Sequence, residues 1–199
     1  MGHIENRITM TIWVTSDLHL NHRMILEYCP KSRGHFSDHI HMTEHIIGHW
    51  NTVVQPDDIA WIIGDVSMGD PAKMYNNISR LNGHLHLVSG NHDHKILRDP
   101  NLVDLFDSVQ SHKKFVYNCY GKDVLVNMNH EPMQTWDGML SGSVMLHGHK
   151  HSTNPDLLTK RIYDVGIDGH PNFSLYNLDS LLYNLLGVPI PTQKEFRRE

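Results

Sequence analysis

Short apolar runs that stop at polar residues recur along the first half of the chain. These runs are rich in β-branched side chains, a pattern that is typical of buried strands ending in polar loops. The sequence predicts three such strands, at residues 11–16, 58–63 and 84–88, which end at Asp17, at Gly64–Asp65 and at residues 89–93.

Two segments between these strands carry helical patterns. Residues 38–54 place apolar side chains roughly along one stripe, as expected for a helix packed on a sheet. Further on, Asp70 followed by Pro71 is typical of an N-cap and a first helical position. That helix is predicted to run to about Leu81, with Gly83 placed to end it. The stripe of the first helix consists of Ile40, Ile46, Ile47, Trp50, Val53 and Val54.

The second half of the chain has strand patterns that lie closer together. Residues 175–186 are expected to form a closing helix or strand, and Pro189 and Pro191 begin a charged tail. The early strands alternate with helices, which predicts an α/β layered core, and the later strands predict a second sheet packed on the first. These later strands are expected at residues 124–128 (ending near His130), 143–146 (ending near His149) and 161–165.

Length and composition are those of one packed domain. The chain has 199 residues, of which 39% are hydrophobic and 20% charged, so global disorder is disfavoured. No apolar run approaches the roughly 18–20 residues that cross a bilayer, and no signal-peptide pattern is seen, so we expect a cytoplasmic protein with no membrane partner. Cys29 and Cys119 are expected to be free thiols. We expect a single domain over residues 1–199, with a core at about 11–187 and a tail at 188–199.

Charge and histidine content narrow the choice of partner. The formal net charge is −5 and there is no basic run, which disfavours a large nucleic-acid-binding surface. Histidine is frequent, at 18 residues, and neutral imidazole is the commonest metal ligand among side chains. Composition leaves a metal site as one hypothesis, because histidine-rich surfaces also occur without a function.

Polar residues follow the carboxyl ends of most predicted strands. Ligands in open α/β sheets bind beyond these ends, so the side chains can meet at one place. Taken singly they are weak indicators, because an Asp after a strand is usually a turn residue or a helix cap. A lone His is likewise more often a surface or core residue. The residues are Asp17, His19, Asp65, Asn91, His92, Asp93, His130, His147, His149 and His151.

The order of these residues resembles the motifs of the calcineurin-like metallophosphoesterase superfamily. The pattern D-x-H, G-D, G-N-H-D, H and G-H-x-H is present in full between residues 12 and about 170. The chain is most similar to small single-domain bacterial and phage phosphoesterases, an observation that residues 165–168 also support. The resemblance implies a four-layer α/β/β/α sandwich with two mixed β-sheets flanked by helices. The five motifs are Asp17–His19, Gly64–Asp65, Gly90–Asp93, His130 and Gly148–His151.

The resemblance also implies a role for each matching position. Asp65 is expected to bridge two divalent metal ions, which together activate a hydroxide for attack on a phosphate ester. Mixed imidazole and carboxylate ligands suit transition metals; manganese is favoured, and nickel, iron, zinc and cobalt stay open. One ion is expected to be bound by Asp17, His19 and His151, and the other by Asn91, His130 and His149.

Other polar residues near the motifs are expected to act on the substrate. His92 matches the superfamily's catalytic histidine, which contacts the phosphate or protonates the leaving oxygen. Asp93 is expected to be catalytic through fixing the imidazole tautomer of His92. His147 stands where the superfamily needs no ligand, and its role stays open. Three residues are weaker predictions as substrate contacts, because surface roles explain them equally well: His22, Arg23 and Arg33.

The expected function is metal-dependent hydrolysis of a phosphate ester, with a small or nucleotide-like phosphodiester favoured. A phosphomonoesterase, a nucleotide pyrophosphohydrolase and a non-catalytic metal-binding scaffold are the alternatives. The scaffold is disfavoured because every expected ligand position and His92 keep a competent residue. Residues 64–69 and 89–93 depart from the motifs of protein Ser/Thr phosphatases, which disfavours that branch. The physiological substrate and the oligomeric state stay open.

Overall fold

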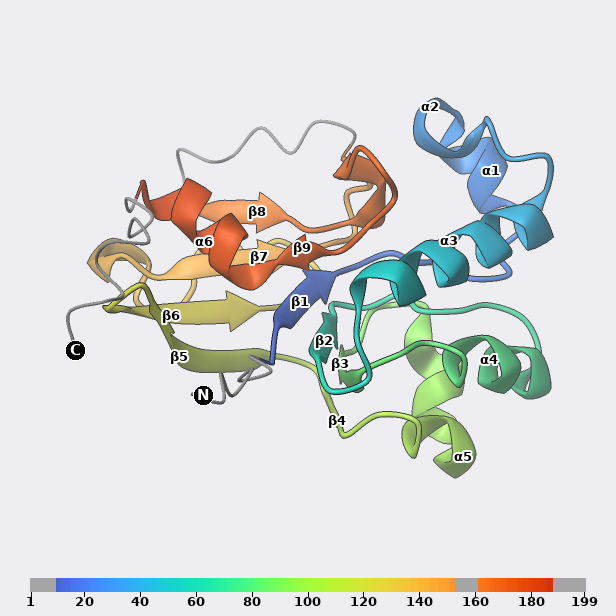
Figure 1. Ribbon diagram of the computed structural model, residues 1–199, viewed down its shortest axis with the longest axis horizontal. Helices are drawn as coiled ribbons and strands as arrows, with labels where there is room; N and C mark the ends of the chain where they lie inside the picture. The colour runs from blue at the N-terminus through green and yellow to red at the C-terminus, as the bar shows by residue number, and fades with distance from the viewer. Residues whose placement is uncertain (1–9, 153–160, 188–199) are drawn as a thin grey trace, which may run out of the picture.

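Two β-sheets lie against each other in the computed structural model of the protein, which describes residues 10–152 and 161–187. Both sheets are mixed and helices pack on them (Figure 1), so the predicted α/β fold with two mixed, helix-flanked sheets is confirmed. The first nine residues and the predicted tail at 188–199 lie outside the described residues.

The first sheet has the strand order β4-β3-β2-β1-β9. Strands β1 to β4 are parallel and β9 is antiparallel to β1. Because parallel strands end at one edge, the loops that follow β1, β2 and β3 meet there. The strands are β1 (Ile12–Thr15), β2 (Ile59–Ile62), β3 (His84–Val88), β4 (Ser108–Gln110) and β9 (Tyr176–Asn177).

Side chains of the first sheet alternate between two cores, as the pleat of a strand requires. In β3, Leu85 and Leu87 face a core shared with helices α3 (His39–Val53) and α4 (Pro71–Ile78), whereas Val88 faces the second sheet. Residues spaced three and four apart lie on one face of α3, and this face packs on the sheet. That face consists of the buried residues Met42, Thr43, Ile46, Ile47 and Trp50.

The helix boundaries differ in detail from the sequence prediction. Asp70 caps α4 by accepting a hydrogen bond from the Lys73 N–H at 2.9 Å, as predicted, but the helix ends at Ile78. Ile40 was placed in the apolar stripe of α3 and is instead 61% exposed. It lies in the first turn of α3, before the buried residues of the packed face begin at Met42.

The second sheet has the order β5-β6-β7-β8, with β5 antiparallel to β6 and the other pairs parallel. Its inner face packs on the first sheet, together with leucines of α6 (Leu178–Leu186). The strands are β5 (Lys113–Cys119), β6 (Lys122–Met128), β7 (Val144–His147) and β8 (Ile162–Asp164). The core between the sheets includes Val14, Trp61, Ile63, Val124, Val126, Val144 and Leu146.

Several elements are absent from the sequence prediction. Strand β5 was missed because its large hydrophobic residues Phe115, Val116 and Tyr117 are consecutive in sequence, although their burial alternates in the structure. Helices α1 (Ile25–Tyr28), α2 (Pro30–Arg33) and α5 (Pro100–Val103) have four residues each, too few to show a period. Residues 175–186 form β9 and then α6, and the Asn177 side chain caps α6.

The two sheets are joined at the edge where the parallel strands end. The Ser16 N–H donates to the Val165 carbonyl at 3.1 Å, and the Ile167 N–H donates to the Ser16 carbonyl at 3.0 Å. Within the second sheet, the Gly148 N–H donates to the His130 carbonyl at 2.9 Å. These bonds bring the loops after β1, β6, β7 and β8 to one place, so the predicted motif residues of both sheets can meet.

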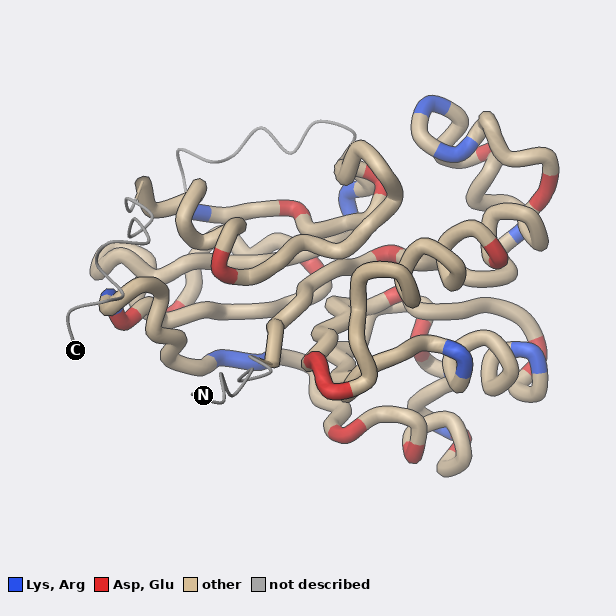
Figure 2. Tube along the Cα trace, in the orientation of Figure 1, with Lys and Arg blue, Asp and Glu red and all other residues tan. Residues whose placement is uncertain are grey.

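Charged residues are dispersed over the described chain rather than gathered on one element (Figure 2). The described residues also contain no helix with both the length and the apolar character needed to span a bilayer.

Candidate metal centre

The backbone at the junction of the sheets is held in an unusual conformation. Five predicted ligands have positive φ angles: Asp17 (58°), His19 (48°), Asp65 (58°), His149 (70°) and His151 (49°). Residues other than glycine rarely adopt this region, and each costs of order 1–3 kcal/mol when they do. Such strain clusters at functional sites, where the surrounding structure imposes it.

Two glycines allow the loops to come this close. A Cβ atom on Gly90 would overlap the Asp65 carboxylate, and one on Gly148 would overlap Ser16 and the Asp17 carboxylate. Only glycine lets the backbone approach these side chains so closely. The glycines of the G-N-H-D and G-H-x-H motifs therefore have a steric reason to be there.

The first ligand group consists of Asp17, His19 and His151. The Asp17 Oδ1 atom lies 4.0 Å from His19 Nε2 and 3.7 Å from His151 Nε2. One ligand atom from each of the three residues lies within 4.8 Å of the others. Asp17 and His19 are buried and His151 is partly buried, so the group can surround one cation.

The second ligand group consists of Asn91, His130 and His149. The Asn91 Oδ1 atom lies 3.0 Å from His130 Nε2 and 3.1 Å from His149 Nδ1. Asp65 lies between the two groups, because its Oδ2 atom is 3.5 Å from His19 Nε2 and 3.4 Å from His130 Nε2. The structure thus brings all seven predicted ligands together.

Hydrogen bonds orient the imidazoles of both groups. His130 directs Nδ1 to the Ile63 carbonyl at 2.8 Å, and His151 directs Nδ1 to the Asp168 carboxylate at 2.8 Å. Both partners accept hydrogen bonds, so each ring keeps its Nε2 atom for the centre. The buried His19 Nε2 atom has no hydrogen-bond partner. A buried nitrogen of this kind is stabilised by a cation, so the residues present fit divalent metal ions.

The charges at the centre shift the pKa values of its ligands. Burial raises the pKa of Asp17 to about 6. Burial would also raise the pKa of Asp65, but the hydrogen bond and charge of His130 outweigh it and lower that pKa to about 2. Burial would lower the pKa of His130, but Asp65 and Asp17 raise it to about 9. Protons and cations therefore compete for the same atoms.

Two further histidines border the ligand groups. The His22 Nδ1 atom is 3.0 Å from His19 Nδ1, and burial followed by the charge of His92 lowers the pKa of His22. His92 is exposed, with its ring centroid 5.7 Å from that of His19. Arg23 is exposed and follows His22 directly. His22 and His92 thus border the centre, whereas for Arg23 the structure shows only that it is exposed.

Arg33 contradicts the prediction of a substrate contact. The side chain is 0% exposed, and its guanidinium forms an ion pair with Asp168 at 2.6 Å. Its remaining donors bond the backbone carbonyls of Asp17 at 2.6 Å and Leu18 at 3.1 Å. A group so enclosed does not reach a substrate.

Asp93 also differs from the prediction. It is 0% exposed and accepts hydrogen bonds from the backbone N–H groups of Asp65 and Val66 at 2.9 Å and of Gly90 at 2.8 Å. Both carboxylate oxygens are used in this way, so Asp93 holds the two loops together rather than fixing the imidazole of His92.

Three further residues lie buried or partly buried beside the motifs, namely His147, Asp168 and Cys29. His147 is buried, directs Nδ1 to the Gly148 carbonyl at 2.8 Å and belongs to no metal-competent group among the described residues. The sequence prediction gave no role to Asp168 or Cys29, yet ligand atoms of both lie within 4.8 Å of one on His151. Only the motif-like Val165–Asp168 stretch hinted at Asp168.

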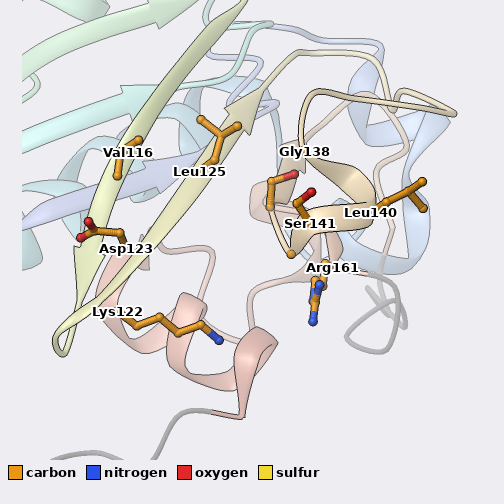
Figure 3. Close-up of a pocket in the computed structure, with 10 residues that line it drawn as sticks. Val116, Lys122, Asp123, Leu125, Gly138, Leu140, Ser141 and Arg161 are labelled. Carbon is orange, nitrogen blue, oxygen red and sulfur yellow. The ribbon is translucent and has the colours of Figure 1, made fainter.

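The structure also has a cavity away from these ligands (Figure 3). It has a volume of about 570 Å³ and lies between the β5–β6 hairpin and the 3-10 helix η2 (Met139–Ser141). None of its lining residues is a predicted ligand or substrate contact.

Fold and site together define an α/β protein with two facing sheets and a cluster of Asp, Asn and His residues at their shared edge that are candidate ligands for divalent metal ions. A sequence profile of the calcineurin-like phosphoesterases matches residues 10–196, and the chain belongs to this family. The chain is accordingly a metal-dependent phosphoester hydrolase.

Similar proteins occur in phages and archaea. The Gene 66 protein of Mycobacterium phage L5 is 28% identical, over 78% of this chain and 86% of its own length. Uncharacterized protein MJ1445 of Methanocaldococcus jannaschii is 29% identical, over 73% of this chain and 72% of its own. In fold, the chain is similar to the crystal structure of AQ665 from Aquifex aeolicus, a protein of unknown function, with a TM-score of 0.64 and 18% identity. This match covers 86% of this chain and 97% of AQ665.

Proposed function

We propose that the protein hydrolyses a small or nucleotide-like phosphodiester at a dinuclear metal centre. One ion is bound by Asp17, His19 and His151 and the other by Asn91, His130 and His149, with Asp65 shared. When bound, two such ions supply Lewis-acid activation of water and of the phosphoryl group. Manganese is the favoured metal, with nickel, iron, zinc and cobalt as competitors, because the ligands mix imidazole nitrogen with carboxylate and amide oxygen.

The position of the Asp65 carboxylate is the main support for two ions. The Asp65 Oδ2 atom lies within 3.5 Å of an imidazole nitrogen from each ligand group, His19 on one side and His130 on the other. A carboxylate between two groups of imidazoles is the arrangement that a pair of cations requires. The Asp65 Oδ1 atom accepts a hydrogen bond from the His92 N–H at 2.9 Å, which fixes the carboxylate in that orientation.

His92 is the proposed catalytic residue of the chain itself. Its ring is exposed and close to His19, so it can contact a phosphate held at the centre. There the imidazole donates a hydrogen bond to a phosphoryl oxygen or a proton to the leaving oxygen. His22 and Arg23 are proposed to lie along the bound substrate, since the His22 ring lies beside His92 and the exposed Arg23 follows it in sequence.

The burial of Arg33 favours a diester over a monoester. A phosphomonoester carries about −1.5 to −2 charges at pH 7, whereas a diester carries about one. The guanidinium of Arg33 is enclosed by Asp168 and by two backbone carbonyls, so it does not neutralise a phosphate. Of the two arginines predicted to contact substrate, Arg23 is then the exposed one.

The proposal is tested by comparing hydrolysis of bis-p-nitrophenyl phosphate and p-nitrophenyl phosphate with Mn²⁺, Ni²⁺, Zn²⁺ and Mg²⁺. We expect a higher kcat/KM for the diester and higher activity with a transition metal than with Mg²⁺. A preference for the monoester would replace the diesterase with a phosphomonoesterase. Stoichiometric metal binding without hydrolysis of either ester would support the scaffold alternative.

A further inference from the structure

We propose that Arg33 and Asp168 form a positioning pair that sets the geometry of the first ligand group. The inference rests on the proposed function, because it assigns these residues to the metal ion held by Asp17, His19 and His151. Neither residue touches the substrate or the reacting atoms. They act through the ligands that they hold.

Asp168 holds the ring of His151. It lies in the 3-10 helix η4 (Ile167–Gly169), and its Oδ2 atom accepts a hydrogen bond from His151 Nδ1 at 2.8 Å. This bond turns His151 Nε2 toward Asp17 Oδ1, 3.7 Å away. A carboxylate behind a metal-binding imidazole fixes both the tautomer and the orientation of the ring.

Arg33 links that carboxylate to the loop that carries the other two ligands. Its Nε and Nη2 atoms donate to the two oxygens of Asp168, at 2.8 and 2.6 Å. Nη2 also donates to the Asp17 carbonyl at 2.6 Å, and Nη1 donates to the Leu18 carbonyl at 3.1 Å. One planar group therefore fixes the relative position of two segments far apart in sequence, residues 17–19 and 168.

The burial of the pair argues for a role other than stability. Both side chains are 0% exposed, and removing two charges from water costs several kcal/mol per ion. Apolar residues of similar volume often stabilise a protein as well as such a pair does, so stability alone gives little reason for it. The geometry gives a better reason for the pair. Each hydrogen bond that the guanidinium donates goes to Asp168, to the ligand loop or to Met42 Sδ.

The test compares metal binding by the wild-type protein with that by Arg33→Met and Asp168→Asn. The metal-free proteins are titrated with Co²⁺, followed by calorimetry and by visible absorption. The wild type is expected to bind two ions. In each variant, one ion is expected to bind about 10- to 100-fold more weakly while the other keeps its affinity. Diesterase activity is expected to fall at limiting metal and to recover at saturating metal.

A matched control is Arg80→Met. Arg80 also forms a double hydrogen bond with a carboxylate, to Glu44 at 2.8 and 2.5 Å, but this pair is exposed and these bonds involve no ligand residue. This variant is expected to bind both ions as the wild type does. Wild-type affinity for both ions in Arg33→Met and Asp168→Asn, with only the melting temperature lowered, would overturn the positioning role.

Milder variants test the same role if the protein does not fold without the buried pair. Ser32→Ala removes one hydrogen bond to Asp168, at 2.5 Å, from a partly exposed position, and Arg33→Lys keeps the charge but loses the planar fork. Each is expected to weaken binding of one ion by about two- to tenfold, and no change in either would overturn the inference. A wild type that binds two ions but hydrolyses no ester would refute the proposed function alone.

Discussion

Asp93 and Asp168 are both buried behind the ligand groups, yet they do different things. Asp168 receives its hydrogen bonds from side chains, those of Arg33, Ser32 and His151. Asp93 receives its bonds from three backbone N–H groups of the loops after β2 and β3. One carboxylate therefore orients an imidazole and the other shapes the backbone that presents Asp65 and Asn91.

The surroundings of the two carboxylates shift their pKa values in opposite directions. Burial would raise the pKa of Asp168, but Arg33 and His151 outweigh it and hold that pKa far below its usual range. Burial raises the pKa of Asp93, because backbone N–H groups carry no full charge to offset it. Asp168 is thus kept ionised by its ion pair, whereas Asp93 relies on hydrogen bonds from backbone amides.

The largest effect is expected from the residue that both ligand groups share. Asp65→Asn removes a negative charge from between two cations, so activity is expected to be abolished and metal occupancy to fall on both sides. Metal content by elemental analysis and diester hydrolysis measure this. Full activity in the variant would refute the shared role of Asp65.

His92 tests whether catalysis can be separated from metal binding. His92→Ala is expected to lower kcat by about 10² to 10⁴, the usual range for a group that transfers a proton or stabilises a transition state. Both ions are expected to remain, because His92 belongs to neither ligand group. Loss of metal in this variant would make His92 a ligand instead.

Proton competition is expected to make metal binding depend on pH. Burial would lower the pKa values of His130 and His151, but neighbouring carboxylates raise them to about 9 and about 10. Both imidazoles must lose a proton to bind a cation, so apparent affinity should rise with pH between about 6 and 9. Each released proton contributes about tenfold per pH unit.

Calorimetry in two buffers with different ionisation enthalpies counts these protons. Equal heats in both buffers would show that no proton is released and would contradict the raised pKa values.

The smallest effect is expected at Asp93, and it should appear in stability rather than in the affinity for one ion. Asp93→Asn replaces one of two acceptor oxygens with a donor that faces N–H groups, so the free energy of unfolding is expected to fall by about 1–3 kcal/mol. Urea unfolding of the metal-free protein measures the loss. Asp168→Asn is the contrasting variant, because its main effect is expected on one metal ion. Identical profiles for the two would remove the distinction between them.

Local patterns predicted most of the first sheet. The strands β1, β2 and β3 and the capped helix α4 could be recognised because their patterns involve residues that are close together in sequence. Strand β5 was missed because its hydrophobic residues do not alternate in sequence, and the four-residue helices α1 and α2 offered no period to detect. The ligands could be predicted because their residue types and their order match motifs. Asp168 also stands in a motif-like stretch, but the sequence does not show which residues it pairs with.

Sequence alone determined which residue types follow which strands, and through them the family and the set of ligands. Tertiary structure alone decided which charged residue meets solvent and which is enclosed. Arg33 was predicted as a substrate contact because its loop was expected to border the cleft, but its partner Asp168 lies 135 positions further along the chain. Burial and ion pairing depend on such distant neighbours, so no local pattern reports them.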